Sequence, residues 1–377
     1  MQASDYLADL IRFPSVSSVS NEDVNAQVEA WLQALDFDLE HTEYTDDAGL
    51  KKCCVIGRKG PEGRGLAYFG HTDVVPVTSW SFPPAGPWTP HIADGRMYGR
   101  GACDMKGSVA TMLAACAASR SDDLKQPLYF VATADEEVGL RGARELVEKS
   151  ELYRRIVHEQ CRAIVGEPTL MQVVHAHKGG QAIRVTATGR AAHSSTGKGR
   201  NANLAMIPFL TELKQLHDEM ESQAEWRDDR FEPPTPTMNI GINDYNGALN
   251  ITAPRSECTI YFRPMPGQDV DAAVARIREA AERNGLAIEL PFSGSSLFTD
   301  PQSQFIQELL ELTSNRESHT VAYCTDGAVF GELKDIAVVG PGSIEQAHTD
   351  DEWIALSELE RGTSLYLAMI RRWCGSR

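Results

Sequence analysis

The sequence predicts an α/β protein in which a mostly parallel sheet has helices on both faces and a small α+β domain is inserted. Three observations carry this prediction. Up to about His177, short apolar runs alternate with helical patterns, which is typical of a parallel sheet covered by helices. The order then becomes roughly βαββαβ, which matches a split-βαβ, ferredoxin-like domain. The α/β alternation returns afterwards, so we predict a larger domain of residues 1–178 and 292–377 and an insertion of residues 179–291.

The elements of the larger domain follow from their apolar spacing. Apolar residues at helical spacing predict helices, and short runs rich in β-branched and aromatic residues predict buried strands. The predicted helices are Ala3–Arg12, Asn21–Leu35, Ser108–Ser119, Arg141–Lys149, Gln302–Thr313 and Ser357–Trp373. The predicted strands are Cys53–Ile56, Leu66–Phe69, Leu128–Ala132, Thr320–Ala322 and Ile336–Val339.

The inserted segment alternates apolar and polar residues where its strands are expected. The predicted order is Gln181–Thr188 (strand), Asn203–Met220 (helix), Pro236–Ile242 and Glu257–Arg263 (strands), Asp269–Asn284 (helix) and Ala287–Leu290 (strand). Because His348 belongs chemically with His71, the two ends of the chain are expected to build one domain around this segment.

Bulk properties limit the possible partners. A chain of 377 residues exceeds one typical core, and its formal net charge of −17 argues against binding nucleic acid, which needs a basic surface. No apolar stretch approaches the ~20 residues of a membrane helix, and the first residues lack the pattern of a signal peptide. The eight cysteines form no Cys-x-x-Cys pair. We therefore expect a cytoplasmic protein with reduced thiols and neither a nucleic-acid nor a membrane partner.

Five segments each carry a side chain that can bind metal at the end of an apolar run. These side chains are His71 and Asp73, Asp104, Glu136 and Glu137, Glu167, and His348. In an open α/β sheet, ligands collect outside the carboxyl ends of the strands. Imidazoles and carboxylates are the donors of zinc-type hydrolytic centres. Each residue alone has a simpler explanation, such as a helix cap for Asp104, but the joint pattern predicts a metal centre.

Spacing suggests how some of these side chains act. His71 and Asp73 lie on the same side of extended backbone, so the carboxylate can accept a hydrogen bond from the ring nitrogen that does not bind metal. Asp104 can bridge two metals, since one carboxylate spans the ~3.5–4 Å between paired ions. Glu136 and Glu137 point to different sides, so we expect one ligand and one general base.

The inserted segment adds candidates that are not metal ligands. His193 follows a strand in AAHSS, where an imidazole could donate to a developing oxyanion. Arg263 and Asn250 lie in the same segment, and a guanidinium suits a substrate carboxylate. Ordinary surface packing would explain these residues equally well from their pattern alone.

The motifs closely resemble those of the M20 family of dinuclear metallo-aminoacylases and peptidases. They are HTDVVP, GRGACDMKG, the Glu136–Glu137 pair, GEPT, AAHSS and AHTDDE, in this order between residues 66 and 354. The resemblance implies two Zn²⁺ ions, for which Co²⁺ can substitute. It implies that Asp104 bridges them, that His71 and Glu167 hold one ion, and that Glu137 and His348 hold the other. Glu136 would then be the general base and later the general acid.

The resemblance also implies roles for the insertion. It would be a lid and dimerisation domain, so a homodimer is expected. His193 would complete the oxyanion site, in dimers across the subunit interface, and Asn250 and Arg263 would bind the carboxylate of a small N-acyl amino acid.

Within the family, several segments are most similar to the acetylornithine deacetylase branch. They are ATADEE, GEPT followed by HAHKG, RPMPG, YCTDGAVF and GPGSIEQAHTDDEW. This branch implies hydrolysis of N-acetyl-L-ornithine to L-ornithine and acetate in arginine biosynthesis. Succinyl-diaminopimelate desuccinylases are the alternative, although they have an arginine pair where this chain has Lys178 and Gly179. A dipeptidase or another aminoacylase, and a non-catalytic binding module of the same fold, also remain open.

Overall fold

The computed structural model describes residues 1–375. They fall into two compact units, which differ in architecture. The first unit comprises Met1–Ala176, Phe298–His319 and the chain from Thr325 onward. The second comprises His177–Leu297 and Thr320–Cys324. The short strands β13 (Leu297–Phe298) and β14 (His319–Val321) lie where the chain passes from one unit to the other.

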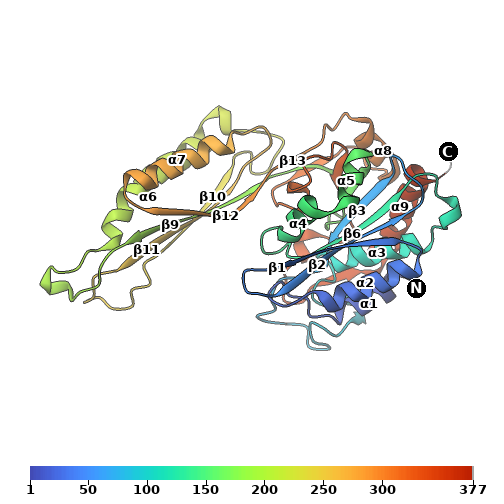
Figure 1. The fold of residues 1–377 in the computed structure, drawn as a ribbon, viewed down its shortest axis with the longest axis horizontal. Helices are drawn as coiled ribbons and strands as arrows, with labels where there is room; N and C mark the ends of the chain where they lie inside the picture. The colour runs from blue at the N-terminus through green and yellow to red at the C-terminus, as the bar shows by residue number, and fades with distance from the viewer. Residues whose placement is uncertain (376–377) are drawn as a thin grey trace. The chain divides into compact units, whose positions relative to one another are not determined.

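The first unit is built on a mixed sheet whose centre is parallel (Figure 1). Its order is β1 (Asp38–Thr45), β2 (Lys51–Lys59), β6 (Leu128–Thr133), β3 (Leu66–His71), β7 (Arg162–Val165), β15 (Ile336–Val338) and β8 (Val174–His177). The strands β6, β3, β7 and β15 run parallel, whereas β1, β2 and β8 pair antiparallel at the two sides. The predicted α/β class with a parallel centre is confirmed.

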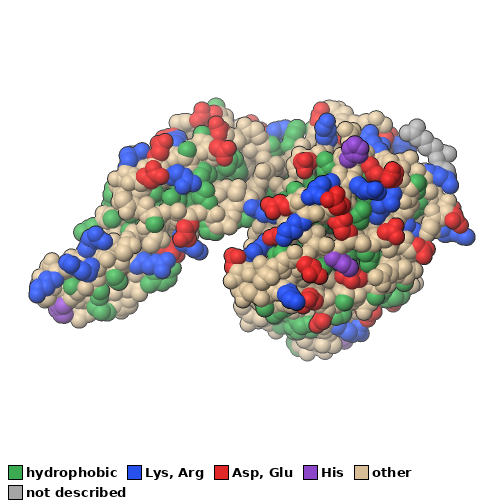
Figure 2. Space-filling view, in the orientation of Figure 1, with side chains coloured by type: hydrophobic (Ala, Val, Ile, Leu, Met, Phe, Trp, Pro, Cys, Tyr) green, Lys and Arg blue, Asp and Glu red, His purple; other side chains and the backbone are tan. Residues whose placement is uncertain are grey.

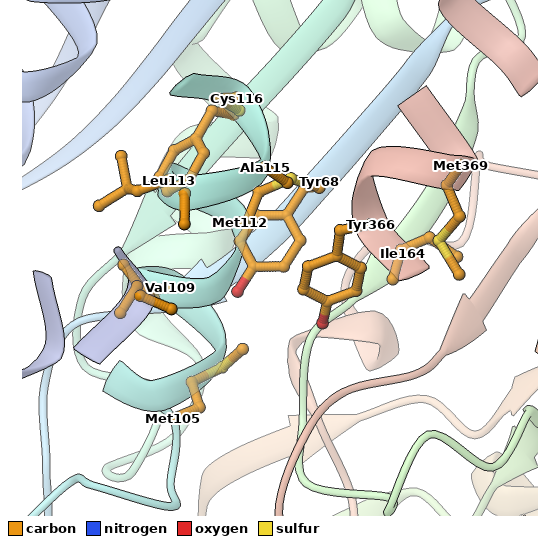
Figure 3. Close-up of a cluster of buried hydrophobic side chains, with 14 of the residues drawn as sticks. Tyr68, Met105, Val109, Met112, Leu113, Ala115, Cys116, Ile164, Tyr366 and Met369 are labelled. Atoms are coloured by element: carbon orange, nitrogen blue, oxygen red, sulfur yellow. The ribbon is translucent and has the colours of Figure 1, made fainter. Parts of the chain in front are cut away.

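Helices cover both faces of this sheet because its central strands bury both sets of side chains. On β3, Tyr68 points into a core shared by α1 (Ala3–Ile11), α2 (Glu22–Ala34), α3 (Lys106–Ala117), α8 (Gln304–Thr313) and α9 (Leu356–Cys374). Figure 3 shows Tyr68 beside Tyr366, with ring centroids 5.5 Å apart. The next residue, Phe69, points to the opposite face and contacts Phe330, which in turn contacts Tyr153 of α5 (Glu151–His158). The helix α4 (Arg141–Lys149) packs on β1, β2 and β6.

A separate three-stranded sheet joins distant parts of the first unit. It consists of β4 (His91–Ala93), β5 (Arg96–Tyr98) and β16 (Trp353–Ala355), in the order β16-β5-β4. This pairing places the residues before Trp353 next to the loop that follows Tyr98.

On the visible face of the first unit, acidic side chains are scattered among basic ones (Figure 2), so the negative charge there is spread over the surface.

The second unit is an antiparallel sheet packed on two helices. Its elements are β9 (Gly180–Thr188), α6 (Ala202–Ser222), β10 (Thr237–Asn243), β11 (Arg255–Arg263), α7 (Val270–Arg283) and β12 (Ala287–Gly294). The sheet order is β10-β11-β9-β12, and the inward residues of β9 and β11 form one core with α6 and α7.

Single 3₁₀ turns occur in both units, at Ser121–Asp123, Ser194–Thr196, Ala224–Trp226, Asp326–Ala328 and Ile344–Gln346. Among the described residues, no helix is both long and apolar enough to cross a membrane.

Candidate metal centre

Three neighbouring parallel strands deliver acids and an imidazole to the same edge of the sheet. His71 is the last residue of β3 and lies opposite Thr133, the last residue of β6. Glu136 and Glu137 follow that strand end. Phe69 pairs with Val165 at the end of β7, and Glu167 comes two residues later. Adjacent parallel strands therefore bring these residues together, as expected at the carboxyl edge of an α/β sheet.

Asp104 lies between two histidines, with one carboxylate oxygen facing each. Its Oδ1 is 3.2 Å from Nε2 of His71, and its Oδ2 is 3.2 Å from Nε2 of His348. On the first side, Glu167 Oε1 is 3.7 Å from His71 Nε2. On the second side, Glu137 Oε1 is 3.1 Å from His348 Nε2. The five predicted metal ligands thus form two groups that share Asp104.

Asp73 stabilises this arrangement through hydrogen bonds to neighbouring segments. Its carboxylate accepts hydrogen bonds from the main-chain N–H groups of Glu136 (3.2 Å) and Glu137 (3.3 Å) and from the Ser17 hydroxyl (2.7 Å). Nδ1 of His71 lies 2.9 Å from the main-chain oxygen of Asp73 and 3.6 Å from its carboxylate. The main chain, rather than the expected carboxylate, thus takes the shorter contact to the ring. A proton on Nδ1 leaves Nε2 free to bind a metal.

The electrostatics of the cluster fit divalent cations. Burial raises the pKa of Glu167, and the nearby Asp104 carboxylate raises it further. Burial also raises the pKa of Glu136. The hydrogen bond with Asp104, followed by that with Glu137, raises the pKa of His348 to about 10. Burial alone would lower the pKa of His71, but the surrounding carboxylates raise it well above its ordinary value. In the absence of cations the raised pKa values therefore favour the protonated forms of these groups, whereas imidazole and carboxylate donors that bind a cation must be deprotonated.

Loading this centre with zinc should release protons. The raised pKa of each imidazole favours its protonated form in the cation-free protein, whereas a histidine must be neutral to bind a metal. We therefore expect protons to be released when both zinc positions fill. Calorimetric titration of the metal-free protein in two buffers of different ionisation enthalpy measures the number of protons released. Zinc binding without proton release would contradict the assignment of His71 and His348.

Sequence reasoning missed three buried acids around the centre. Asp135 is 2 % exposed; it forms an ion pair with Lys52 (2.7 Å) and accepts a hydrogen bond from Tyr44. Asp326 accepts a hydrogen bond from Thr133, and burial raises its pKa to about 6. Glu352 is fully buried beside the segment that carries Asp104. Their partners are 83, 193 and 248 positions away in the chain, so local patterns gave no signal.

The three remaining predicted residues belong to the second unit. His193 is exposed, and its Nδ1 lies 2.7 Å from the Ser195 hydroxyl. The main-chain oxygen of Asn250 accepts a hydrogen bond from Ser194, so the segments of His193 and Asn250 lie together. Arg263 ends β11, with its guanidinium 4.8 Å from the Tyr261 ring centroid. Its Nη1 is buried and has no hydrogen-bond partner within residues 1–375.

Comparisons with known proteins give the family of the chain. Residues 67–372 match the model of peptidase family M20/M25/M40. The chain is 33 % identical to an acetylornithine deacetylase of Myxococcus xanthus, covering 98 % of this chain and 97 % of the relative. It is 32 % identical to the acetylornithine deacetylase of Proteus mirabilis, covering 97 % and 95 %.

Solved structures share the fold at lower identity. The M20 family metallo-carboxypeptidase Sso-CP2 of Sulfolobus solfataricus superposes with a TM-score of 0.75 at 17 % identity, covering 99 % of both chains. The YXEP protein of Bacillus subtilis, described as a dinuclear metal binding peptidase of the M20 family, superposes with a TM-score of 0.65 at 14 % identity, covering 98 % of this chain and 96 % of that one.

Proposed function

Because the chain belongs to peptidase family M20/M25/M40, whose members are hydrolases, we propose that it is a metal-dependent amidohydrolase acting on N-acyl amino acids. The observation that carries the proposal is the position of Asp104, with one oxygen facing His71 and the other facing His348. The proposed substrate is N-acetyl-L-ornithine, giving L-ornithine and acetate. The identity of about one third to acetylornithine deacetylases over nearly the whole chain supports this substrate.

The donor set fits two divalent cations, which we propose to be Zn²⁺ with Co²⁺ as a substitute. His71 and Glu167 would hold one ion, Glu137 and His348 the other, and Asp104 would contact both. When bound, such ions polarise a carbonyl oxygen and lower the pKa of water. The imidazole–carboxylate composition, free of thiolate, suits a hydrolytic rather than an electron-transfer centre.

Glu136 is the proposed general base. The structure places Glu136 and Glu137 in a turn rather than in the expected extended backbone, and the main-chain N–H groups of both donate to Asp73, which anchors the segment. Glu137 reaches His348, which leaves Glu136 to act on water. Because burial raises the pKa of Glu136, its carboxylate can take a proton from the attacking water and return it to the leaving amine.

The second unit is proposed to be the inserted lid and dimerisation domain. Its His193 would donate to the oxyanion, and Asn250 and Arg263 would hold the carboxylate of the substrate. The buried Nη1 of Arg263, which has no hydrogen-bond partner within residues 1–375, supports this role. A buried guanidinium donor without a partner destabilises the protein unless a ligand accepts its hydrogen bond. The dimer and the cytoplasmic location stay predictions.

The test is amine release by zinc- or cobalt-loaded protein. The substrates would be N-acetyl-L-ornithine, N-succinyl-LL-diaminopimelate and a short panel of dipeptides, each with and without a chelator. We expect turnover of the acetyl compound that the chelator abolishes. Turnover of only the succinyl compound or only the dipeptides would keep the metal chemistry and overturn the substrate. Turnover that survives complete metal removal would overturn the metal-dependent mechanism.

A further inference from the structure

Glu352 receives four hydrogen bonds from one short segment. Its Oε2 accepts from Nη1 of Arg100 (2.7 Å) and from the N–H of Gly101 (2.9 Å). Its Oε1 accepts from the N–H groups of Cys103 (2.9 Å) and Asp104 (3.0 Å). The carboxylate is fully buried, so these donors replace the water that it loses. Bonds to an ionised carboxylate are about twice as strong as neutral ones.

The backbone of this segment is shaped for that contact. Gly101 has φ +79°, a conformation that L side chains rarely adopt, and a Cβ there would lie 2.7 Å from Cγ1 of Val74. The resulting turn aims the N–H groups of Gly101, Cys103 and Asp104 at one carboxylate, an arrangement that binds anions elsewhere in proteins. Here the chain supplies its own anion, and that anion arrives from a segment about 250 residues away.

The same carboxylate fastens two ligand-bearing segments together. Asp104 is itself one of the donors, and Glu352 lies four positions after His348. The pairing of β16 with β5 continues the contact, since the main-chain oxygen of Glu352 accepts a hydrogen bond from the N–H of Gly99 (3.0 Å). His348 has φ +64°, which is unfavourable for a non-glycine residue and persists only when the surrounding structure holds it.

We infer that Glu352 is a positioning residue that holds Asp104 and His348 in the geometry that binds the two cations. The inference rests on the proposed metal-dependent function. Without the carboxylate, the N–H groups of Cys103 and Asp104 would lose their common acceptor, and Asp104 could turn away from the two histidines. A residue of this kind contributes to metal affinity without touching the metal.

Glu352→Gln tests the inference because it keeps the size of the side chain. The new amide places an NH₂ group against N–H donors, so one pair of donors loses its acceptor. We expect metal affinity to fall about 10- to 100-fold. Competition with a chromophoric zinc chelator measures the affinity, and the visible absorption of the cobalt-loaded protein reports the geometry around the metal.

The matched control is Glu308→Gln on α8. Glu308 also accepts two side-chain hydrogen bonds, from Trp373 and Gln304, and is only 13 % exposed, but it lies outside the centre. Its substitution should leave zinc affinity and the cobalt spectrum unchanged. If Glu352→Gln does not fold, as judged by circular dichroism, Glu352→Asp replaces it. Its carboxylate is one methylene shorter and cannot reach both pairs of donors.

The outcomes separate the inference from the proposed function. A wild-type protein that binds neither cation and hydrolyses nothing would overturn the proposed function. A wild-type protein that binds two ions and turns over substrate, with the same affinity and spectrum in a folded Glu352 variant, would overturn the inference alone. A weakened affinity with an altered cobalt spectrum, absent from Glu308→Gln, supports the positioning role.

Discussion

Glu136→Gln should bind both zinc ions as tightly as the wild type and yet lose about 10²- to 10⁴-fold in kcat on N-acetyl-L-ornithine. The amide has nearly the same shape as the carboxylate but cannot take a proton from water. The hydrogen bond from the main-chain N–H of residue 136 to Asp73 does not depend on the side chain, so the segment stays in place. Steady-state kinetics together with metal analysis measure the two effects separately.

Glu137→Gln is the matched comparison for this experiment. Glu137 Oε1 lies 3.1 Å from Nε2 of His348. Loss of this carboxylate should therefore weaken metal binding, and activity should fall because the metal is lost. The two variants therefore differ in which quantity changes. A Glu136→Gln protein with nearly normal kcat would remove Glu136 as the base. If Glu136→Gln lost metal while Glu137→Gln kept it, the two roles would have to be exchanged.

Elements with a strong internal pattern could be predicted closely. The helix Arg141–Lys149 has the predicted bounds, and β3 begins at the predicted residue, Leu66. The strand β12 was predicted to end at Leu290, just before Pro291, but the chain passes a bulge between Glu289 and Phe292 and pairs again as far as Gly294. Proline is compatible with a strand at a sheet edge or at a bulge, and only the tertiary pairing reveals that β12 is such an edge strand and continues.

The missed elements have little apolar signal of their own. The strand β1 (Asp38–Thr45) is mostly polar, because it lies at the edge of the sheet and pairs only with β2. The helix α5 (Glu151–His158) is short and buries only Tyr153 and Ile156. The strands β4, β5 and β16 have three residues each, which is too few to establish a period. Long-range pairing, rather than local preference, makes these segments regular.

The same distinction applies to the centre. His71, Glu137 and Glu167 could be picked out because each follows an apolar run that forms a strand, and Asp104 and His348 because they completed the same pattern of donors; the structure places the five side chains together. Lys52, Asp135 and Glu352 could not, because a charged residue gives no sign in the sequence that it is buried. Their burial depends on partners supplied by distant segments.

Lys52 is a buried cation whose charge is balanced by a partner from a distant segment. Its substitution by methionine should destabilise the first unit by about 3–5 kcal/mol. The ammonium is 1 % exposed; it donates to Asp135 (2.7 Å) and to the main-chain oxygens of Ser17 (2.6 Å) and Val19 (2.7 Å). Methionine fills the space but removes the ion pair of the buried Asp135 carboxylate, which keeps the hydrogen bond from the Tyr44 hydroxyl. The midpoint of chemical denaturation, followed with and without zinc, measures the loss.

Two further variants make the measurement specific to the buried charge. Lys149→Met breaks an exposed pair with Glu145 on α4 and should cost about 0–1 kcal/mol. Adding Asp135→Asn to Lys52→Met should restore part of the stability, because the amide carries no charge and asparagine tolerates the φ of +55° at this position. Equal losses for Lys52→Met and Lys149→Met would show that the pair contributes no more than a surface contact. Asp135 directly precedes Glu136, and the Ser17 hydroxyl donates to Asp73. We therefore expect Lys52→Met to disturb the position of the proposed base, Glu136, as well as to destabilise the fold.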